Sequence, residues 1–133
     1  MFEIVNLENV DFCSVENKMG YNKKTGRHFI TKEYQYFKKL VWAYAKKSRI
    51  KLPSPYRVII KMSTSLDMDN TLKGIYDGLE QAGVIDNDKN ILECFIFKVF
   101  SPRGKPGKLK IYIDTIIQKE LSHEDNRKMV SRK

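Results

Sequence analysis

The sequence of 133 residues is poor in cysteine, in histidine and in long apolar runs. Cys13 and Cys94 are far apart and have no metal-like spacing, so the sequence predicts neither a disulfide framework nor a zinc site. His28 and His123 are single and are not spaced like metal ligands. No apolar run approaches the roughly 20 residues that cross a bilayer, so we expect no membrane partner. The N-terminal segment has no basic region followed by an apolar core, so we expect no secretory signal and a reducing, intracellular compartment.

What the chain does contain fits one domain, since a domain usually has roughly 100–200 residues. Hydrophobic residues make up 41% of the sequence, which argues against a wholly disordered chain. The net charge of +9 favours a polyanionic partner, and nucleic acid before a membrane surface.

This charge is unevenly distributed along the chain. Residues 18–65 hold thirteen basic residues and one acidic residue, a net charge of +12. Residues 98–113 hold five basic residues and no acidic residue. Between them, residues 66–97 hold seven acidic and two basic residues, a net charge of −5. An acidic segment therefore lies between two basic stretches.

Apolar periodicity and turn residues predict the element order strand, helix, strand, helix, strand, strand. Helices are expected over 31–49, with Thr31 as N-cap, and over about 69–82, with Gly83 after the C-terminus. Strands are expected over 1–10, 56–66, 91–100 and 109–117, a loop over 13–27, a short extended piece over 27–30, and a hairpin loop over 101–108. The predicted fold class is α/β (α+β), a mixed β-sheet with two main helices packed on it. Residues 1–117 would form the domain, and residues 118–133 a charged tail or short helix.

The first predicted helix is amphipathic. Its apolar stripe includes Tyr34, Phe37, Val41 and Tyr44 and is interpreted as core rather than as a platform for stacked bases. Its opposite face is basic and carries Lys32, Lys39 and Lys46.

The second predicted helix begins beside a group of acidic residues. Asp67 and Asp69 flank Met68 where a strand ends, so their carboxylates can meet at one spot. Lys73 follows Asp69 by one helical turn. Asp88 lies in the turn before the next strand, and an antiparallel return of the helix could bring it beside the first pair. Converging carboxylates favour a hard cation such as Mg²⁺, which can activate water for phosphodiester cleavage.

Each of these residues also has a plain structural interpretation. Asp67 and Asp69 could simply cap a helix, and Asp88 could be a turn former. Lys73 could form a surface ion pair with Asp69 or Asp77. The basic helix face could be merely solvated.

The run LDMDNTLKGIYDGLEQAGVIDNDKNILECFIFK (66–98) resembles the RusA family of Holliday junction resolvases. Asp67-x-Asp69-Asn70, Lys73, Asp77-x-Leu79, Ala82-Gly83-Val84-Ile85, Asp88 and Lys98 follow in family order without a gap. Upstream, Ser14-Val15-Glu16-Asn17 and Gly26-Arg27 through Thr31-Lys32-Glu33 resemble the family more loosely. Asn87 precedes Asp88 where the family usually has two adjacent acids, so the role passes to Asp88, with Asp86 as the alternative.

This resemblance implies a homodimeric, Mg²⁺-dependent endodeoxyribonuclease that binds four-way DNA junctions and nicks two strands symmetrically. Mn²⁺ is an alternative metal, and no organic cofactor is implied. Asp67, Asp69 and Asp88 would bind the metal and Lys73 would assist catalysis or contact the scissile phosphate. Residues expected on DNA are Lys98, Lys23, Lys24, Arg27, Lys32, Lys39, Lys46, Arg103 and Lys105. The expected location is the cytoplasm of a bacterial or phage-infected cell, in association with the nucleoid.

Three alternatives stay open at this point. The chain could be a junction-binding module of the same fold that has lost catalysis. It could be an endonuclease that acts on other branched DNA, such as flaps. It could also be a basic structural or RNA-associated protein, which would show neither metal-dependent cleavage nor a preference for junctions.

Overall fold

A computed structural model describes residues 1–12, 19–66, 68–102 and 105–117. The chain is an α+β domain with a mixed sheet and two α-helices. Residues 118–133, predicted to be a tail or a short helix, lie outside the described residues. In chain order the elements are β1 (Phe2–Val10), β2 (Met19–Asn22), β3 (Arg27–Ile30), α1 (Lys32–Lys47), β4 (Tyr56–Thr64), α2 (Met68–Ala82), the 3-10 helix η2 (Asp88–Asn90), β5 (Ile91–Phe100) and β6 (Gly107–Thr115).

Four strands form one mixed sheet in the order β1-β6-β4-β5. β4 pairs antiparallel with β6 and parallel with β5, so β5 and β6 are not neighbours. The prediction that residues 101–108 close a hairpin is therefore wrong, since this segment connects two strands that flank β4. Apolar alternation indicates which face of a strand is buried, and it carries no information on which strand lies beside it.

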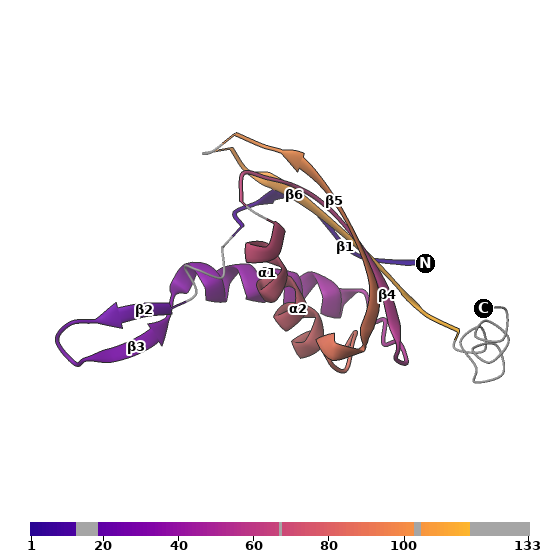
Figure 1. Ribbon diagram of the computed structural model, residues 1–133, viewed down its shortest axis with the longest axis horizontal. Helices are drawn as coiled ribbons and strands as arrows, with labels where there is room; N and C mark the ends of the chain where they lie inside the picture. Colours follow the sequence, from indigo (N-terminus) through magenta and orange to yellow (C-terminus); the bar gives the residue numbers. More distant parts are fainter. Residues whose placement is uncertain (13–18, 67, 103–104, 118–133) are drawn as a thin grey trace, which may run out of the picture.

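Both α-helices cover the same face of this sheet (Figure 1). In β4 every second residue from Tyr56 to Thr64 is buried, as the period of two in a strand requires. The core lies between this face and the helices. α1 contributes four buried side chains to it: Tyr34, Phe37, Val41 and Ala45.

The local signals that predicted the helices are confirmed. The Thr31 hydroxyl accepts a hydrogen bond from the Tyr34 backbone N–H at the start of α1, and Gly83 follows α2 with φ of 76°. Tyr44, by contrast, was expected in the core and is 41% exposed. A helical wheel gives the direction of a side chain, but not whether another element covers it at that point of the helix.

The helices pack closely because α2 presents glycines to α1. A Cβ atom added to Gly74 would lie 2.7 Å from Cδ2 of Phe37, and one added to Gly78 would lie 2.8 Å from Cβ of Val41. Real Cβ atoms essentially never approach so closely, so the two glycines set the distance between the helices. This contact fixes the position of the α2 residues that lie beside them.

β5 is an edge strand with unusual exposure of large apolar side chains. A monomeric protein usually protects such an edge with charge, with proline or with a covering element. The exposed residues on β5 are Leu92, Phe95, Phe97, Val99 and Phe100.

No helix in the described part of the chain is long and apolar enough to cross a membrane.

β2 and β3 form a separate, antiparallel two-stranded sheet. This β2–β3 hairpin (residues 19–30) projects away from the helices and the large sheet (Figure 1). The sequence predicted a loop over 13–27 followed by a short extended piece. The first strand of the hairpin was missed because its four residues, Met-Gly-Tyr-Asn, show no apolar alternation.

Candidate functional site

The acidic group predicted from the sequence lies at the start of α2. The backbone of Asp69 is in the first turn of this helix, which begins at Met68. Lys73 follows one turn later, as expected. Asp67 lies outside the described residues, and so does the side chain of Asp69. The described part of the site therefore consists of Lys73 and its neighbours.

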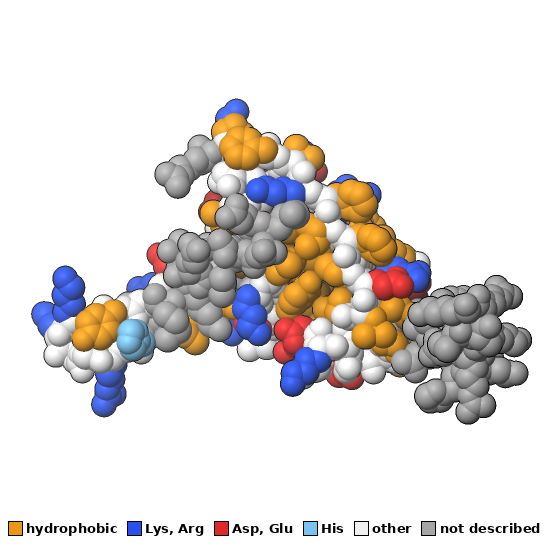
Figure 2. All heavy atoms as spheres, viewed as in Figure 1, with side chains coloured by type: hydrophobic (Ala, Val, Ile, Leu, Met, Phe, Trp, Pro, Cys, Tyr) orange, Lys and Arg blue, Asp and Glu red, His pale blue; other side chains and the backbone are white. Residues whose placement is uncertain are grey.

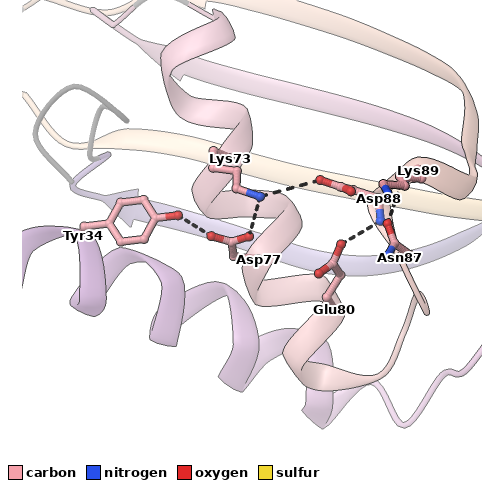
Figure 3. Close-up of polar contacts among 7 residues, drawn as sticks. All are labelled: Tyr34, Lys73, Asp77, Glu80, Asn87, Asp88 and Lys89. Atoms are coloured by element: carbon pink, nitrogen blue, oxygen red, sulfur yellow. Dashed lines mark hydrogen bonds and ion pairs between the residues drawn. The ribbon is translucent and has the colours of Figure 1, made fainter. Parts of the chain in front are cut away.

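Lys73 lies between two carboxylates. Its Nζ is 3.1 Å from Oδ1 of Asp77, on the next turn of α2, and 3.8 Å from Oδ2 of Asp88 (Figure 3). The Lys73 side chain is 46% exposed, and that of Asp88 is 30% exposed. Lys73 and Asp88 come from segments that are distant in the sequence, and they are therefore close neighbours in the fold that can both be reached from solvent.

The charge state of Lys73 follows from these contacts. A hydrogen bond to Asp77 and the negative charge of that carboxylate raise the pKa of Lys73, and the charge of Asp88 adds to the same effect. The ammonium group is therefore protonated at neutral pH and beyond. It is a fixed positive charge within the acidic segment.

A network of hydrogen bonds holds Asp88 in place. Glu80 of α2 accepts a hydrogen bond from the Asp88 backbone N–H at 2.7 Å, which ties the start of η2 to the helix (Figure 3). On the other side of the turn, the buried Tyr56 accepts a hydrogen bond from the Asp86 N–H at 3.0 Å. Asn90 donates to the Asp86 carboxylate at 2.9 Å, which lowers the pKa of Asp86. The turn before β5 is thus rigidly connected to both α2 and β4.

Two residues of this site had no catalytic or metal-binding role in the sequence-based prediction. Asp77, expected as part of the family motif and as a possible ion-pair partner of Lys73, also accepts a 2.5 Å hydrogen bond from the hydroxyl of Tyr34 on α1. Glu80 had no predicted role. Their spacing of four and seven residues from Lys73 places all three on one face of the helix and could have indicated the cluster. The contact with Tyr34 depends on how the helices pack and leaves no trace in the sequence.

Lys98, expected on DNA near the site, lies on β5 on the face that the helices cover. Lys98 pairs in register with the buried Met62 of β4. It follows Cys94 by four residues on β5, and Sγ of Cys94 is 3.3 Å from the hydroxyl of Tyr76 on α2. Four strand residues span about 13 Å, and α2 runs antiparallel to β5 in Figure 1. Lys98 is therefore displaced from Tyr76 toward the N-terminal end of α2, where the backbone of Asp69 lies.

A pocket of about 250 Å³ lies at the end of β4, directly before Asp67. Lys105, another residue expected on DNA, lines it together with Asp11, Ser65 and Leu66. The pocket thus brings the basic segment after β5 beside the residues that precede α2. Arg103, predicted to act with Lys105, lies outside the described residues.

The other basic residues predicted to contact DNA are exposed but lie on other parts of the molecule. Lys32, Lys39 and Lys46 are exposed on the face of α1 opposite its buried stripe, and Lys46 lies 5.0 Å from the ring centre of Trp42. Lys23, Lys24 and Arg27 are exposed on the β2–β3 hairpin, which lies apart from α2 in Figure 1. The structure brings none of these six residues to the Lys73 cluster.

The three predicted donors, all carboxylates, are of the type that suits a hard divalent cation. Carboxylate oxygens are the ligands that Mg²⁺ prefers, and Asp88 presents a partly exposed carboxylate beside the helix that carries Asp69. Among the described residues, which leave out Asp67 and the Asp69 side chain, no three His, Cys, Asp or Glu side chains lie close enough to bind a metal. Asp88 is thus the one predicted ligand whose side chain the structure places.

A family model described as endodeoxyribonuclease RusA matches residues 14–114, which include all of α2, the turn before β5 and most of β6. The chain belongs to the RusA family. RusA proteins are endodeoxyribonucleases that act on Holliday junctions. No curated protein matches the sequence. The resemblance read from residues 66–98 is confirmed at the level of the family, and the individual site residues of this RusA protein stay predictions.

Proposed function

We propose that this chain is a Mg²⁺-dependent, homodimeric endonuclease that resolves four-way DNA junctions by paired, symmetric nicks. The observation that carries the proposal is that Nζ of Lys73, one turn after Asp69 on α2, lies 3.8 Å from Oδ2 of Asp88. Both residues lie within the part of the chain that the RusA family model matches. An exposed cation and a partly exposed carboxylate at one point suit a phosphodiester substrate and its metal.

In this proposal Asp67, Asp69 and Asp88 hold the metal. A bound Mg²⁺ would neutralise charge on the phosphodiester and activate a water molecule for attack. Mn²⁺ could replace it, since it accepts the same oxygen ligands.

Lys73 contacts the scissile phosphate and stabilises the negative charge that develops on it. Asp77 is a positioning residue, because it holds the Lys73 ammonium on one side while the Tyr34 hydroxyl holds Asp77 on the other. Glu80 fixes the backbone of Asp88 and so keeps that carboxylate next to Lys73. Lys98 and Lys105 would contact DNA near the cleavage site.

The homodimer is supported by the exposed apolar residues of β5. A strand with one free edge and exposed Phe95, Phe97 and Val99 is suited to an interface rather than to solvent. A dimer with two-fold symmetry would also present two equivalent sites to the two strands of a junction.

The test of this function uses a four-way junction labelled on each strand in turn, with a linear duplex of the same sequence as control. We expect the wild type to nick two opposing strands of the junction with Mg²⁺ and to leave it intact with chelator. Asp69→Asn should bind the junction at least as well, because it removes negative charge near phosphate, but should not cut. Equal affinity for the duplex and the junction would contradict selectivity for branched DNA. Cleavage by Asp69→Asn at the wild-type rate would contradict the metal site.

The alternatives are separate outcomes of the same experiment. Junction binding without any cleavage by the wild type would indicate a binding module of this fold. Faster cleavage of a flap than of the junction would indicate another branched substrate.

A further inference from the structure

The β2–β3 hairpin is the most exposed element of the described chain. Every residue from Tyr21 to His28 is exposed, and Tyr21 retains 55% of its accessible surface. The hairpin forms a sheet of its own and projects from the start of α1 (Figure 1). A projecting element of this kind contributes little to the core, so its sequence is free to serve a contact outside the domain.

The hairpin is nonetheless built as a defined structure. At its turn, the side-chain oxygen of Asn22 accepts hydrogen bonds from the backbone N–H groups of Lys24, at 2.9 Å, and Thr25, at 3.3 Å. The Asn22 carbonyl accepts a third, from Gly26 at 2.8 Å, and Gly26 has a φ of 69° that favours glycine. Only Thr31, the N-cap of α1, separates the hairpin from that helix. The ribbon is therefore preorganised rather than a free loop.

Its charge is of one sign. Residues 19–30 include Lys23, Lys24 and Arg27 and no acidic residue. Figure 2 shows these basic side chains in blue on several sides of the hairpin, with no red among them. The rings of Tyr21 and His28, which are paired across the two strands, lie 5.1 Å apart at its surface. Positive charges around a compact aromatic pair suit a nucleic acid, because its phosphates are anionic and its bases are flat and carry hydrogen-bonding groups.

We propose that the β2–β3 hairpin enters the major groove of a duplex arm of the DNA substrate, with its three cations on the phosphates beside the groove. The inference rests on the proposed function for its substrate. Two paired strands about 4.8 Å apart fit the major groove, about 12 Å wide, whereas the minor groove, about 6 Å wide, is too narrow for a ribbon with side chains.

The length of the hairpin determines where on the DNA arm this contact lies. The four extended residues of β3, Arg27 to Ile30, span roughly 13 Å, and Lys24 lies in the turn beyond them. At about 3.4 Å per base pair, this length corresponds to roughly four base pairs of duplex. The hairpin therefore holds an arm of the junction away from the crossover, and the cleavage site itself is formed by other elements.

The test uses chelator throughout, so that it does not depend on cleavage. Dimethyl sulfate methylates guanine N7 in the major groove and adenine N3 in the minor groove. On a four-way junction we expect the wild type to protect guanine N7 over a short stretch of duplex away from the crossover. Replacing Lys23, Lys24 and Arg27 together by alanine should abolish this protection. It should also reduce the slope of log K against log salt by about 2 to 3, as the loss of three phosphate contacts requires.

A control variant that removes the same number of positive charges elsewhere tests whether the effect is specific to the hairpin. The triple alanine variant of Lys47, Arg49 and Lys51, all exposed near the C-terminal end of α1, also removes three positive charges. It should retain both the protection and the salt slope. Tyr21→Ala, which keeps all charges, should weaken the N7 protection and leave the salt slope unchanged.

Three outcomes would overturn the inference. The first is N7 protection that survives in the hairpin triple variant, and the second is protection at adenine N3 instead. The third is a change in sedimentation of the hairpin triple variant, which would assign the hairpin to contact with a second copy of the chain. Failure of the proposed function is distinct, because the wild type would then show no preference for the junction over duplex.

Discussion

The ammonium nitrogen of Lys73 lies 3.8 Å from a carboxylate oxygen of Asp88, although a helix and a turn separate them in the chain. Two sets of contacts hold these residues in place. Packing of α2 on α1, which Gly74 and Gly78 allow, brings Tyr34 to Asp77 beside Lys73, and Glu80 holds the backbone of the Asp88 turn against α2. The candidate site is thus a product of helix packing and of one turn.

Lys73 is expected to act through its positive charge. We predict that Lys73→Ala lowers the rate of junction cleavage about 100-fold, which is typical for loss of one group that stabilises charge in the transition state. Affinity for the junction in chelator should change little. Single-turnover cleavage rates, measured with saturating enzyme, provide the check, and Lys89→Ala is the control because it removes an exposed lysine next to Asp88. Equal rates for Lys73→Ala and Lys89→Ala would contradict the role of Lys73.

Asp77 should set the pH range over which Lys73 is charged. Its hydrogen bond and negative charge raise the pKa of Lys73, so the folded protein keeps this ammonium protonated to a higher pH than the unfolded chain does. The stabilising contribution of the pair is complete below the ordinary lysine pKa and is lost as the pH rises through the raised value.

Asp77→Asn removes that effect and should lower the pKa of Lys73. We therefore predict that the alkaline limb of the cleavage rate moves to lower pH in this variant. Profiles of single-turnover rate against pH, recorded at constant ionic strength and metal concentration, would show the shift. A limb at the same pH in both proteins would mean that Lys73 does not set it.

The hydrogen bond between Tyr34 and Asp77 should contribute to stability. Tyr34 is only 1% exposed, and its hydroxyl donates to a carboxylate. Tyr34→Phe should therefore lower the free energy of unfolding by about 1.5–3 kcal/mol, the usual range for a hydrogen bond to a charged group. Urea unfolding measures this difference. Tyr36→Phe, at a residue that is 62% exposed, should have no effect, and equal losses in the two variants would refute the assignment.

Gly78 should not tolerate a methyl group. In most helix interiors, replacing glycine by alanine gains about 0.5–1 kcal/mol. Here the added Cβ would lie 2.8 Å from Cβ of Val41 and 3.0 Å from the Lys38 carbonyl oxygen, and such overpacking costs about 1–3 kcal/mol. Gly78→Ala should therefore unfold at lower urea concentration than the wild type, while the exposed Gln81→Ala should not. Greater stability of Gly78→Ala would show that the helices can separate at little cost.

The exposed strand β5 should carry the dimer. Phe97 is 57% exposed on this edge strand, and a charge there would be buried in any interface formed by β5. We predict that Phe97→Glu sediments as a monomer at concentrations where the wild type is a dimer. Tyr36→Glu places the same charge on an exposed aromatic residue of α1 and should leave the dimer intact. A dimer that persists in Phe97→Glu would move the interface elsewhere.

The sequence was informative wherever the signal is local. Thr31 and Gly83 mark helix ends through their own backbone preferences, and the order of the main elements follows from apolar periodicity. The sequence also predicted that Asp88 returns toward the start of α2, because a helix that runs antiparallel to the next strand leaves few places for the connecting turn. The contact of Asp88 with Lys73 itself was not predicted.

What could not be predicted depends on contacts between distant segments. The alternation in residues 91–117 gives two strands, but only the sheet shows that β4 lies between them. Asp77 reads as an ordinary helix residue until the packing of α1 brings Tyr34 to it. The β2–β3 hairpin is held by its own turn and pairing, which leave almost no apolar pattern in the sequence.

The most direct test of the whole account compares three carboxylate substitutions by their single-turnover cleavage of a four-way junction with Mg²⁺. Asp88→Asn alters the carboxylate beside Lys73, Asp86→Asn alters the alternative acid two residues before it, and Asp114→Asn alters a half-buried acid on β6. We predict that Asp88→Asn binds the junction but does not cut it, while the other two variants cleave at rates close to the wild type. Wild-type cleavage by Asp88→Asn, or its loss in Asp86→Asn instead, would contradict the placement of the nuclease site at Lys73 and Asp88.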